Sequence, residues 1–479
     1  MLRSRRATAL ILVAVVLLAA LGATLVLEGD DPASDRPNIL VVMTDDQTLE
    51  SMRVMPRVKA LIADQGVTFT DSIVSFSLCC PSRATFLTGQ YSHNHGVRGN
   101  QPPNGGYEVF DDEDTTLPAA LQAAGYTTAH VGKYLNGYGF DDPVSAPPGW
   151  DEWFTELDVR SQRYRGFTML ENGEVRTYGQ DDYSTDVFTD RAVDVLERHA
   201  DSEDPLFLAV DYFAPHADLA FTEDALTPAT PADRHLGRFE DEPLPDDPSF
   251  DEVDVSDKPE SIRSRPRVGP RTEAAIRFNY ARYLESLLAV DEGVDRLITV
   301  LEQTGQLDDT VVIFTSDNGY FFGEHRITRG KERFYEPSIA VPLYVRGPGI
   351  PAGEERRSLV ANIDLAPTIL DLAGATAKRP ADGRSLVPML RDGEEGPEDR
   401  AVLLESAMGG PNDLVPDYGV RTGRYAYFEL QTGERELYDL EQDPHQLDNR
   451  AGDPDLADVE ARLAAEVARL KGCAGQSCR

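Results

Sequence analysis

A largely apolar run, Pro37-Asn-Ile-Leu-Val-Val-Met-Thr44, leads directly into the acidic pair Asp45-Asp46. Continuous apolar runs of this length are typical of strands in a parallel sheet, because helices cover such strands on both faces. We therefore expect a buried strand at residues 37–44 that ends on two carboxylates.

The chain repeats this pattern of apolar runs separated by segments of helical spacing. Further strands are predicted at residues 127–131, 206–211, 310–315 and 341–346. Helices are predicted at residues 55–63, 117–124, 185–198, 273–303 and 364–373. Strands that alternate with helices indicate an α/β fold, in which helices sandwich a large and mostly parallel sheet.

The composition changes twice along the chain. Residues 217–270 are dense in Pro, Asp and Glu with little periodicity, which indicates a surface insertion in a larger domain, residues 37–397. Beyond that domain, short alternating runs around two Thr-Gly turns are typical of antiparallel strands, and residues 455–471 have helical spacing. We predict a small C-terminal α+β domain with an antiparallel sheet at residues 398–479.

The first residues have the character of a targeting segment. Three arginines among the first six residues precede an uncharged run at residues 7–27, and an acidic stretch follows. This order predicts a signal peptide or an N-terminal membrane anchor, with residues 28–36 as a linker. We therefore expect an exported protein, extracellular or at the cell surface, which residues 7–27 anchor if they are not cleaved.

Two of the four cysteines, Cys473 and Cys478, lie in the last seven residues. An oxidising compartment would close this short loop into a disulfide, and the alternative is a pair of free thiols.

The overall charge limits the partners that the protein can have. The chain of 479 residues has 83 acidic and 46 basic side chains, a formal net charge of −37. A surface this acidic does not hold phosphate backbones, which excludes nucleic acid as a partner, and it disfavours broad adhesion to anionic membranes. Membrane contact is expected only through the N-terminal segment. An anionic substrate would need a local cluster of metal, Arg and Lys.

The segment Cys79-Cys-Pro-Ser-Arg-Ala-Thr-Phe-Leu-Thr-Gly89 carries the strongest chemical signal. Its Pro-Ser pair suits the first turn of a helix, and Gly89 suits the end of that helix. Cys79 would then lie at the helix N-terminus, where exposed N–H groups and the dipole favour negative charge. Arg83 lies one turn further along, on the same face.

The pattern Cys-x-Pro-Ser-Arg-x-x-x-Leu-Thr-Gly over residues 79–89 resembles the signature of the sulfatase family. The resemblance implies an alkaline-phosphatase-like fold, so that residues 37–397 would be a catalytic sulfatase domain. It also implies that a formylglycine-generating enzyme oxidises Cys79 to formylglycine, whose hydrate is the nucleophile. Cys80 falls in the variable position of the signature.

The same resemblance assigns a metal site. Asp45-Asp46 and Asp317-Asn318 look like the two metal-binding pairs of the family, each placed after a strand, and the modified Cys79 would join them. Oxygen ligands suit Ca²⁺, with Mg²⁺ as the alternative, better than they suit zinc. Taken alone, each pair could equally be a solvated turn.

Further residues match family positions by their local sequence. Lys133 and Lys331 match two sulfate-binding lysines, and His216 matches the histidine that assists the leaving oxygen. Arg83 would hold the formylglycine hydrate. His93 and His95 are weaker candidates for contacts with substrate, and a surface loop is the alternative interpretation.

The segments around these residues resemble the N-acetylglucosamine-6-sulfatase and extracellular heparan-sulfatase branch. They include Gly132-Lys-Tyr-Leu-Asn-Gly137 and Val341-Pro-Leu-Tyr-Val-Arg-Gly-Pro-Gly349. The resemblance implies a sulfuric ester hydrolase that removes O-sulfate from a carbohydrate such as N-acetylglucosamine 6-sulfate. The alternatives are an arylsulfatase, a phosphonate or phosphodiester hydrolase, or an inactive carbohydrate-binding surface protein. The last is disfavoured because none of the candidate residues is missing.

Overall fold

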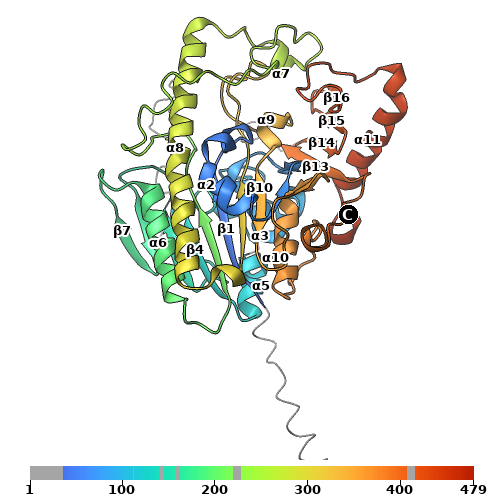
Figure 1. The fold of residues 1–479 in the computed structure, drawn as a ribbon. Helices are drawn as coiled ribbons and strands as arrows, with labels where there is room; N and C mark the ends of the chain where they lie inside the picture. The colour runs from blue at the N-terminus through green and yellow to red at the C-terminus, as the bar shows by residue number, and fades with distance from the viewer. Residues whose placement is uncertain (1–35, 112, 141–144, 158–161, 219–227, 407–415) are drawn as a thin grey trace, which may run out of the picture. The chain divides into compact units, whose positions relative to one another are not determined.

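A computed structural model describes residues 36–479 except 112, 141–144, 158–161, 219–227 and 407–415 (Figure 1). The predicted signal peptide or anchor at residues 7–27 and nearly all of the predicted linker lie outside the described residues. Within the described ranges, no helix is both long enough and apolar enough to cross a bilayer.

The centre of the fold is a ten-stranded sheet with the order β11-β2-β10-β9-β1-β8-β4-β5-β6-β7. The strands are β1 (Asn38–Thr44), β2 (Val67–Phe69), β4 (Thr127–Gly132), β5 (Glu152–Glu156), β6 (Thr168–Glu171), β7 (Glu174–Thr177), β8 (Leu206–Asp211), β9 (Thr310–Ser316), β10 (Leu343–Arg346) and β11 (Glu354–Arg356). The five strands from β9 to β5 are parallel. This core confirms the predicted mostly parallel sheet, although β10, predicted at 341–346, pairs antiparallel with β9.

Helices cover both faces of this sheet, as the alternating pattern predicts (Figure 1). Successive side chains of β1 point to opposite faces of the sheet. Leu40 and Val42 pack in one hydrophobic layer, and Ile39 and Val41 pack in the other. The first layer contains α6 (Ser184–Arg198) and α8 (Pro270–Gln303), and the second contains α3 (Cys79–Thr88), α5 (Leu117–Ala123) and α10 (Leu365–Leu372). The helix predicted at 55–63 begins as α2 (Pro56–Val58) and continues as a π-helix, η3 (Lys59–Ala63).

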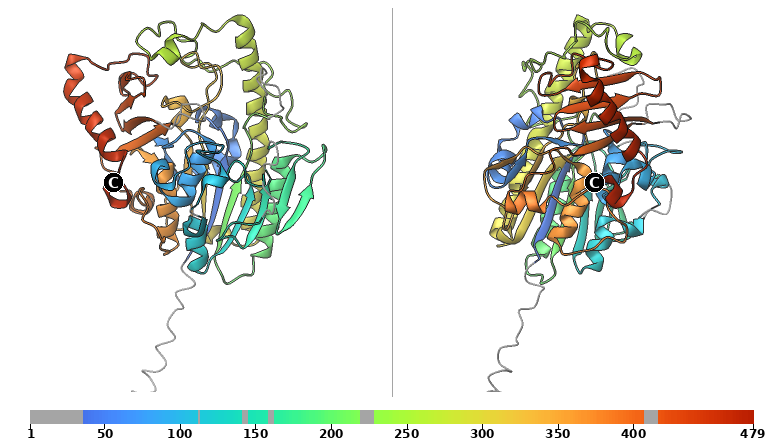
Figure 2. Two further views of the ribbon diagram at one scale, coloured as in Figure 1. Left: turned by 180° about the vertical axis from the view of Figure 1, so that it is seen from behind. Right: turned by 90° about the vertical axis from the view of Figure 1, so that its right-hand side faces the viewer.

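A second, antiparallel sheet lies near the C-terminus of the chain. Its strands are β13 (Ala401–Ser406), β14 (Asp417–Thr422), β15 (Tyr425–Glu429) and β16 (Arg435–Asp439). Helix α11 (Ala457–Leu470) lies across this sheet and buries Leu463, Val467 and Leu470 (Figure 2). The small antiparallel sheet confirms the predicted C-terminal architecture, while the domain boundary at residue 398 stays a prediction.

Part of the predicted insertion at residues 217–270 is anchored in the protein. It contains the short helix α7 (Glu260–Arg263). Lys258, just before this helix, is fully buried, and its Nζ lies 3.2 Å from Glu252 and donates to the Leu447 carbonyl at 2.7 Å. The end of the segment is therefore bound to the C-terminal part of the chain rather than lying entirely at the surface.

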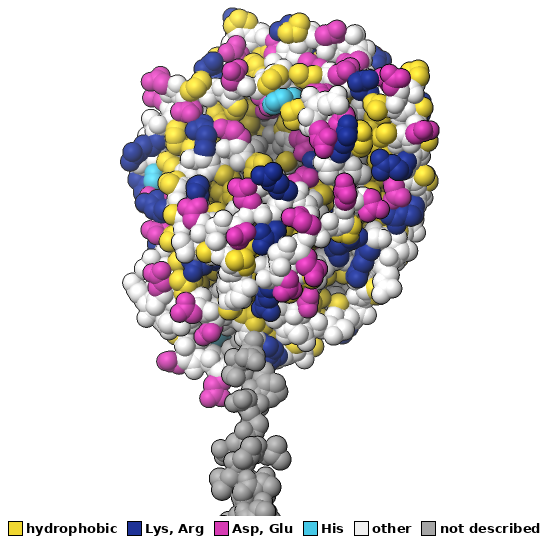
Figure 3. All heavy atoms as spheres, turned by 45° about the vertical axis from the view of Figure 1, so that its right-hand side comes forward, with side chains coloured by type: hydrophobic (Ala, Val, Ile, Leu, Met, Phe, Trp, Pro, Cys, Tyr) yellow, Lys and Arg dark blue, Asp and Glu magenta, His cyan; other side chains and the backbone are white. Residues whose placement is uncertain are grey.

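The acidic side chains are dispersed on the face drawn in Figure 3. Asp and Glu are interspersed with Lys and Arg there, and they do not gather into a patch of a single sign. On this face, therefore, the large net charge does not take the form of one acidic surface.

Candidate active site

The strand register brings the predicted site residues to one edge of the large sheet. Thr44 pairs with Ser316, so Asp45 and Asp317 follow directly at the ends of neighbouring strands. On the other side of β1, Asp211 ends β8 and pairs with Gly132, which precedes Lys133. Carboxylates and cations from four distant parts of the sequence therefore meet at the carboxyl ends of parallel strands.

Asp46 turns the chain at the end of β1. Its backbone has a φ of +68°, a left-handed conformation that non-glycine residues adopt at a cost of roughly 1 kcal/mol. Its N–H donates to Asp317 Oδ1 at 3.1 Å, and its carbonyl accepts from the Tyr283 hydroxyl at 2.8 Å. These contacts fix the strained turn that presents the Asp46 carboxylate.

Cys79 begins α3, as the sequence predicts, and Gly89, which has a φ of +67°, caps the C-terminus of this helix. The Cys79 side chain is fully buried. Its Sγ lies 3.5 Å from Asp45 Oδ1 and 2.9 Å from Lys331 Nζ. The helix start therefore places the thiol between a carboxylate and an ammonium group.

Arg83 connects the helix to the strand ends. Its Nε donates to Asp317 at 2.8 Å, and its Nη1 donates to Asp211 at 3.1 Å and to the Lys133 carbonyl at 3.0 Å. A third carboxylate, that of Asp45, lies 3.4 Å from Nη2. Because the guanidinium is buried among these groups, it fixes the position of α3 relative to the sheet.

The two lysines and His216 contact the same carboxylates. Lys133 donates to Asp45 and Lys331 donates to Asp46. His216 Nδ1 donates to the Ala217 carbonyl at 2.7 Å, which leaves Nε2 directed to the site at 3.7 Å from Asp46 Oδ2. The structure thus brings together every residue of the predicted catalytic set.

The carboxylate and amide oxygens of this site, rather than the Cys79 sulfur or the His216 nitrogen, are the donors that a hard divalent cation prefers. Asp45, Asp46, Cys79 and His216 offer ligand atoms that all lie within 4.8 Å of one another. Asn318 Nδ2 donates to Asp46 Oδ1 at 2.6 Å, while the buried Asn318 Oδ1 has no hydrogen-bond partner among the described residues. A buried carbonyl oxygen without a donor is the kind of ligand that Ca²⁺ and Mg²⁺ accept. These residues can therefore hold a metal ion.

The electrostatics reflect this crowding of charges. Burial acts to raise the pKa of Asp45, but the attraction of Lys133, His216 and Arg83 prevails and lowers it. Burial and the Asp45 charge raise the pKa of Asp317 to about 6. Burial and Asp45 also raise the pKa of Cys79 to about 12, so its thiol is protonated at neutral pH.

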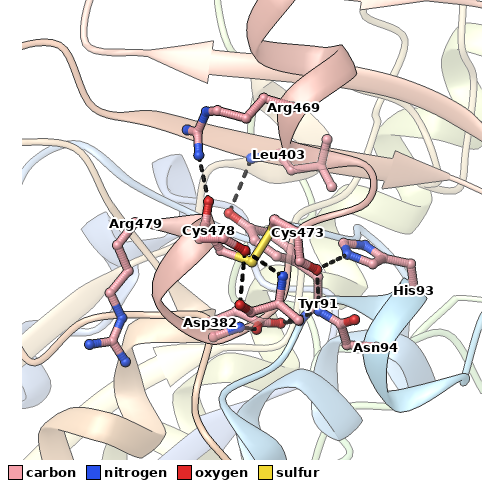
Figure 4. The surroundings of a disulfide bond; sticks show 12 residues. Tyr91, His93, Asn94, Asp382, Leu403, Arg469, Cys473, Cys478 and Arg479 are labelled. Carbon is pink, nitrogen blue, oxygen red and sulfur yellow. Dashed lines mark hydrogen bonds between the residues drawn. A yellow bond between two sulfur atoms is a disulfide. The ribbon is translucent and has the colours of Figure 1, made fainter.

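His93 and His95 are engaged in contacts with the protein instead. His93 Nδ1 lies 3.1 Å from Glu405, and Nε2 donates to the Cys473 carbonyl at 3.0 Å, beside the disulfide between Cys473 and Cys478 (Figure 4). His95 Nδ1 accepts from the Val97 N–H at 3.2 Å, and Nε2 lies 3.1 Å from the Thr85 hydroxyl. Both side chains are buried, so a plain surface loop was the wrong alternative. Their contact with substrate stays a prediction.

Asp211 is a site residue that sequence analysis did not identify. Its Oδ1 accepts from Arg83, and its Oδ2 lies 3.1 Å from His130 Nε2. The available signal was an acidic residue that ends an apolar strand, the pattern that singled out Asp45. Without a family motif at this position, that signal could not be separated from an ordinary strand end.

Comparison with known proteins agrees with this geometry. A family model described as Sulfatase matches residues 37–375, and one described as N-sulphoglucosamine sulphohydrolase, C-terminal, matches residues 323–472. The chain belongs to the sulfatase family. N-acetylglucosamine-6-sulfatase of Homo sapiens is 35% identical to this sulfatase, over 97% of the chain and 90% of the human protein.

Two further relatives extend the comparison. A putative extracellular sulfatase homolog of Caenorhabditis elegans is 36% identical over 74% of this chain and 49% of its own length. A solved structure, described as a complex with its substrate D-glucosamine-2-N,6-O-disulfate, matches with a TM-score of 0.78 and 27% identity, over 90% of this chain and 97% of that one. This sulfatase is a sulfuric ester hydrolase with an alkaline-phosphatase-like fold.

Proposed function

We propose that this sulfatase removes the 6-O-sulfate of an N-acetylglucosamine-like sugar. The observation that carries the proposal is the convergence of Lys133, Lys331 and Arg83 at one buried point in a chain of net charge −37. Such a cluster suits a small anionic group. The names of the human relative and of the ligand in the solved complex indicate which sulfated sugar.

Two groups complete the proposed site. Asp45, Asp46, Asp317 and Asn318 would hold Ca²⁺, or Mg²⁺ as the alternative, and a formylglycine-generating enzyme would convert Cys79 to formylglycine. A bound divalent cation stabilises negative charge on oxygen as a Lewis acid, and formylglycine supplies a hydrated aldehyde as the nucleophile. The buried Asn318 oxygen and the placement of Cys79 beside Asp45 support this assignment.

The chain's own residues bind the sulfate and move the proton. Lys133 Nζ and Lys331 Nζ bind sulfate oxygens and offset the charge that develops on them. His216 protonates the leaving sugar oxygen as an imidazolium: Nε2 gives up its proton, while Nδ1 keeps its own proton on the Ala217 carbonyl and so fixes the ring. Burial lowers the pKa of this ring, so Nε2 releases the proton readily. Arg83 keeps Asp317 and Asp45 in place, so the nucleophile and the carboxylates stay aligned.

The proposed location is outside the cytoplasm. The basic, apolar and acidic order of the first 31 residues supports export, and a relative is named as an extracellular sulfatase. Residues 7–27 act as a signal peptide, or as the membrane anchor if they remain attached.

Two measurements test the proposal, and the adjacent thiol provides a matched control. In protein from its native host, the peptide that contains Cys79 should be about 18 Da lighter than its unmodified form. Cys79→Ser should abolish repeated turnover, whereas Cys80→Ser, which changes a neighbouring buried thiol, should retain it. Equal loss in the two variants would contradict the assignment of the nucleophile.

A substrate comparison tests the specificity. We expect the highest kcat/KM for 6-sulfated N-acetylglucosamine, then for p-nitrophenyl sulfate, and the lowest for p-nitrophenyl phosphate. A higher value for either nitrophenyl compound would favour the arylsulfatase or the phosphoester hydrolase instead.

A further inference from the structure

Lys331 lies on an irregular loop between two residues with left-handed backbones. Gly330 has a φ of +92° and Glu332 a φ of +71°. Glycine adopts this conformation freely, but glutamate does so only where the surrounding structure holds it. The place of Lys331 Nζ, 2.9 Å from Cys79 Sγ, therefore depends on the groups that hold Glu332.

Two serines from distant parts of the chain hold the backbone of Glu332. Its N–H donates to the Ser77 carbonyl at 3.1 Å, and its carbonyl accepts from Ser406 Oγ at 3.0 Å. Ser77 also donates its own hydroxyl to the Arg333 carbonyl at 3.1 Å. Both serines are 2% exposed, so water does not compete strongly for these bonds.

The two serines belong to segments that are themselves joined. Ser77 lies two residues before Cys79, and Ser406 is the last residue of β13. The N–H of Glu405, the residue before Ser406, donates at 2.9 Å to the carbonyl of Ser75, two residues before Ser77. The Glu405 carboxylate in turn lies 3.1 Å from His93 Nδ1, on the short helix α4 (Ser92–His95) that follows α3. The end of β13 is therefore fixed against the segments on both sides of the Cys79 helix.

We propose that Ser406 is a positioning residue of the active site. Its hydroxyl, delivered by the C-terminal sheet, keeps Glu332 left-handed and so places Lys331 against Cys79 and Asp46. Ser406 acts through Lys331 and has no contact with the reacting atoms. The inference rests on the proposed role of Lys331 in binding the sulfate group. The antiparallel sheet thereby contributes to the reaction indirectly, because one hydroxyl from its edge strand holds the loop that carries Lys331.

The test compares variants of Ser406 in the mature, metal-loaded enzyme. Ser406→Thr keeps the hydroxyl. Ser406→Val has the shape of threonine without the hydroxyl, so the comparison of these two variants isolates the hydrogen bond. Ser406→Ala removes the hydroxyl with the least steric change. Ser92→Ala is a matched control, because Ser92 is also buried and donates its hydroxyl to a backbone carbonyl, that of Val97.

The readouts are kcat, KM and the dissociation constant of inorganic sulfate measured by calorimetry. We expect the Val and Ala variants to bind sulfate about tenfold more weakly and to lose kcat, while the Thr variant keeps most of both. Ser92→Ala should lower the melting temperature by a similar amount and leave sulfate binding unchanged. If Ser406 had only a structural role, its Val and Ala variants would lose melting temperature but would bind sulfate as the wild type does.

Two results would overturn the proposal, and they differ in what else they imply. If Lys331→Ala weakens sulfate binding but Ser406→Val does not, Ser406 does not position Lys331, and the proposed function stands. If Lys331→Ala itself binds sulfate as the wild type does, the proposed role of Lys331 fails, and the inference falls with it.

Discussion

Removing the buried guanidinium of Arg83 should destabilise the protein strongly. The Arg83 side chain is 5% exposed, and it lies 2.8 Å from Asp317 and 3.1 Å from Asp211. Arg83→Ala leaves these carboxylates buried without their shared cation, which typically costs about 3–5 kcal/mol of the free energy of unfolding. The measurement is urea unfolding in excess chelator, so that no metal ion replaces the lost charge.

Arg234→Ala is the matched control for this experiment. Arg234 also bridges two carboxylates, with distances of 2.7 Å to Asp186 and 2.7 Å to Glu292, but its side chain is 42% exposed. Solvent screening limits such a pair to about 1 kcal/mol or less. Equal and small losses in the two variants would refute the conclusion that burial of Arg83 among carboxylates fixes α3 to the sheet.

Three further predictions follow from other parts of the structure. If Asp45, Asp46 and Asp317 hold the proposed cation, chelation should stop sulfate release and lower the melting temperature, and added Ca²⁺ should restore both. A melting temperature that chelator leaves unchanged would contradict the metal site. Burial raises the pKa of Glu436 from 4.5 to about 7, so its contribution to stability is present at low pH and is lost as the pH rises through 7. Glu436→Gln should therefore stabilise the protein by up to about 3 kcal/mol near pH 8 and by nothing near pH 4 in thermal melts, and a pH-independent difference would be evidence against it. Replacing both Cys473 and Cys478 with serine opens a loop with a sequence separation of 5 and should lower the free energy of unfolding in urea by about 2 kcal/mol, where no loss would show that the bond adds nothing.

The sequence predicts the features that depend on local patterns of residues. The buried strand at residues 37–44 appears as β1, and the motif at residues 79–89 appears as α3, which begins at Cys79 and is capped by Gly89. Strands that are buried on both faces have continuous apolar runs, and helix ends have typical residues, so neither feature needs knowledge of the rest of the chain. The meeting of Asp45 and Asp317 followed from the resemblance rather than from spacing.

The features that escaped prediction depend on contacts between distant residues. The antiparallel direction of β10 arises from its partner β9 and not from its own sequence. His93 has the composition of a surface loop, but it is buried because the tail around Cys473, 380 residues later, packs on it. The support of Lys331 by Ser406 likewise requires β13, a strand that no periodic pattern marked.

The burial of Cys79 constrains the biosynthesis of the enzyme. In the folded chain this thiol has no exposed surface and lies beneath Lys331 and Asp45. A second protein cannot bring its own catalytic groups to an enclosed side chain, so the proposed oxidation of Cys79 has to precede the folding that encloses it. A host in which the chain folds before it meets the modifying enzyme would accumulate folded protein without sulfatase activity. Only unfolding in the presence of the modifying enzyme would then allow Cys79 to be oxidised.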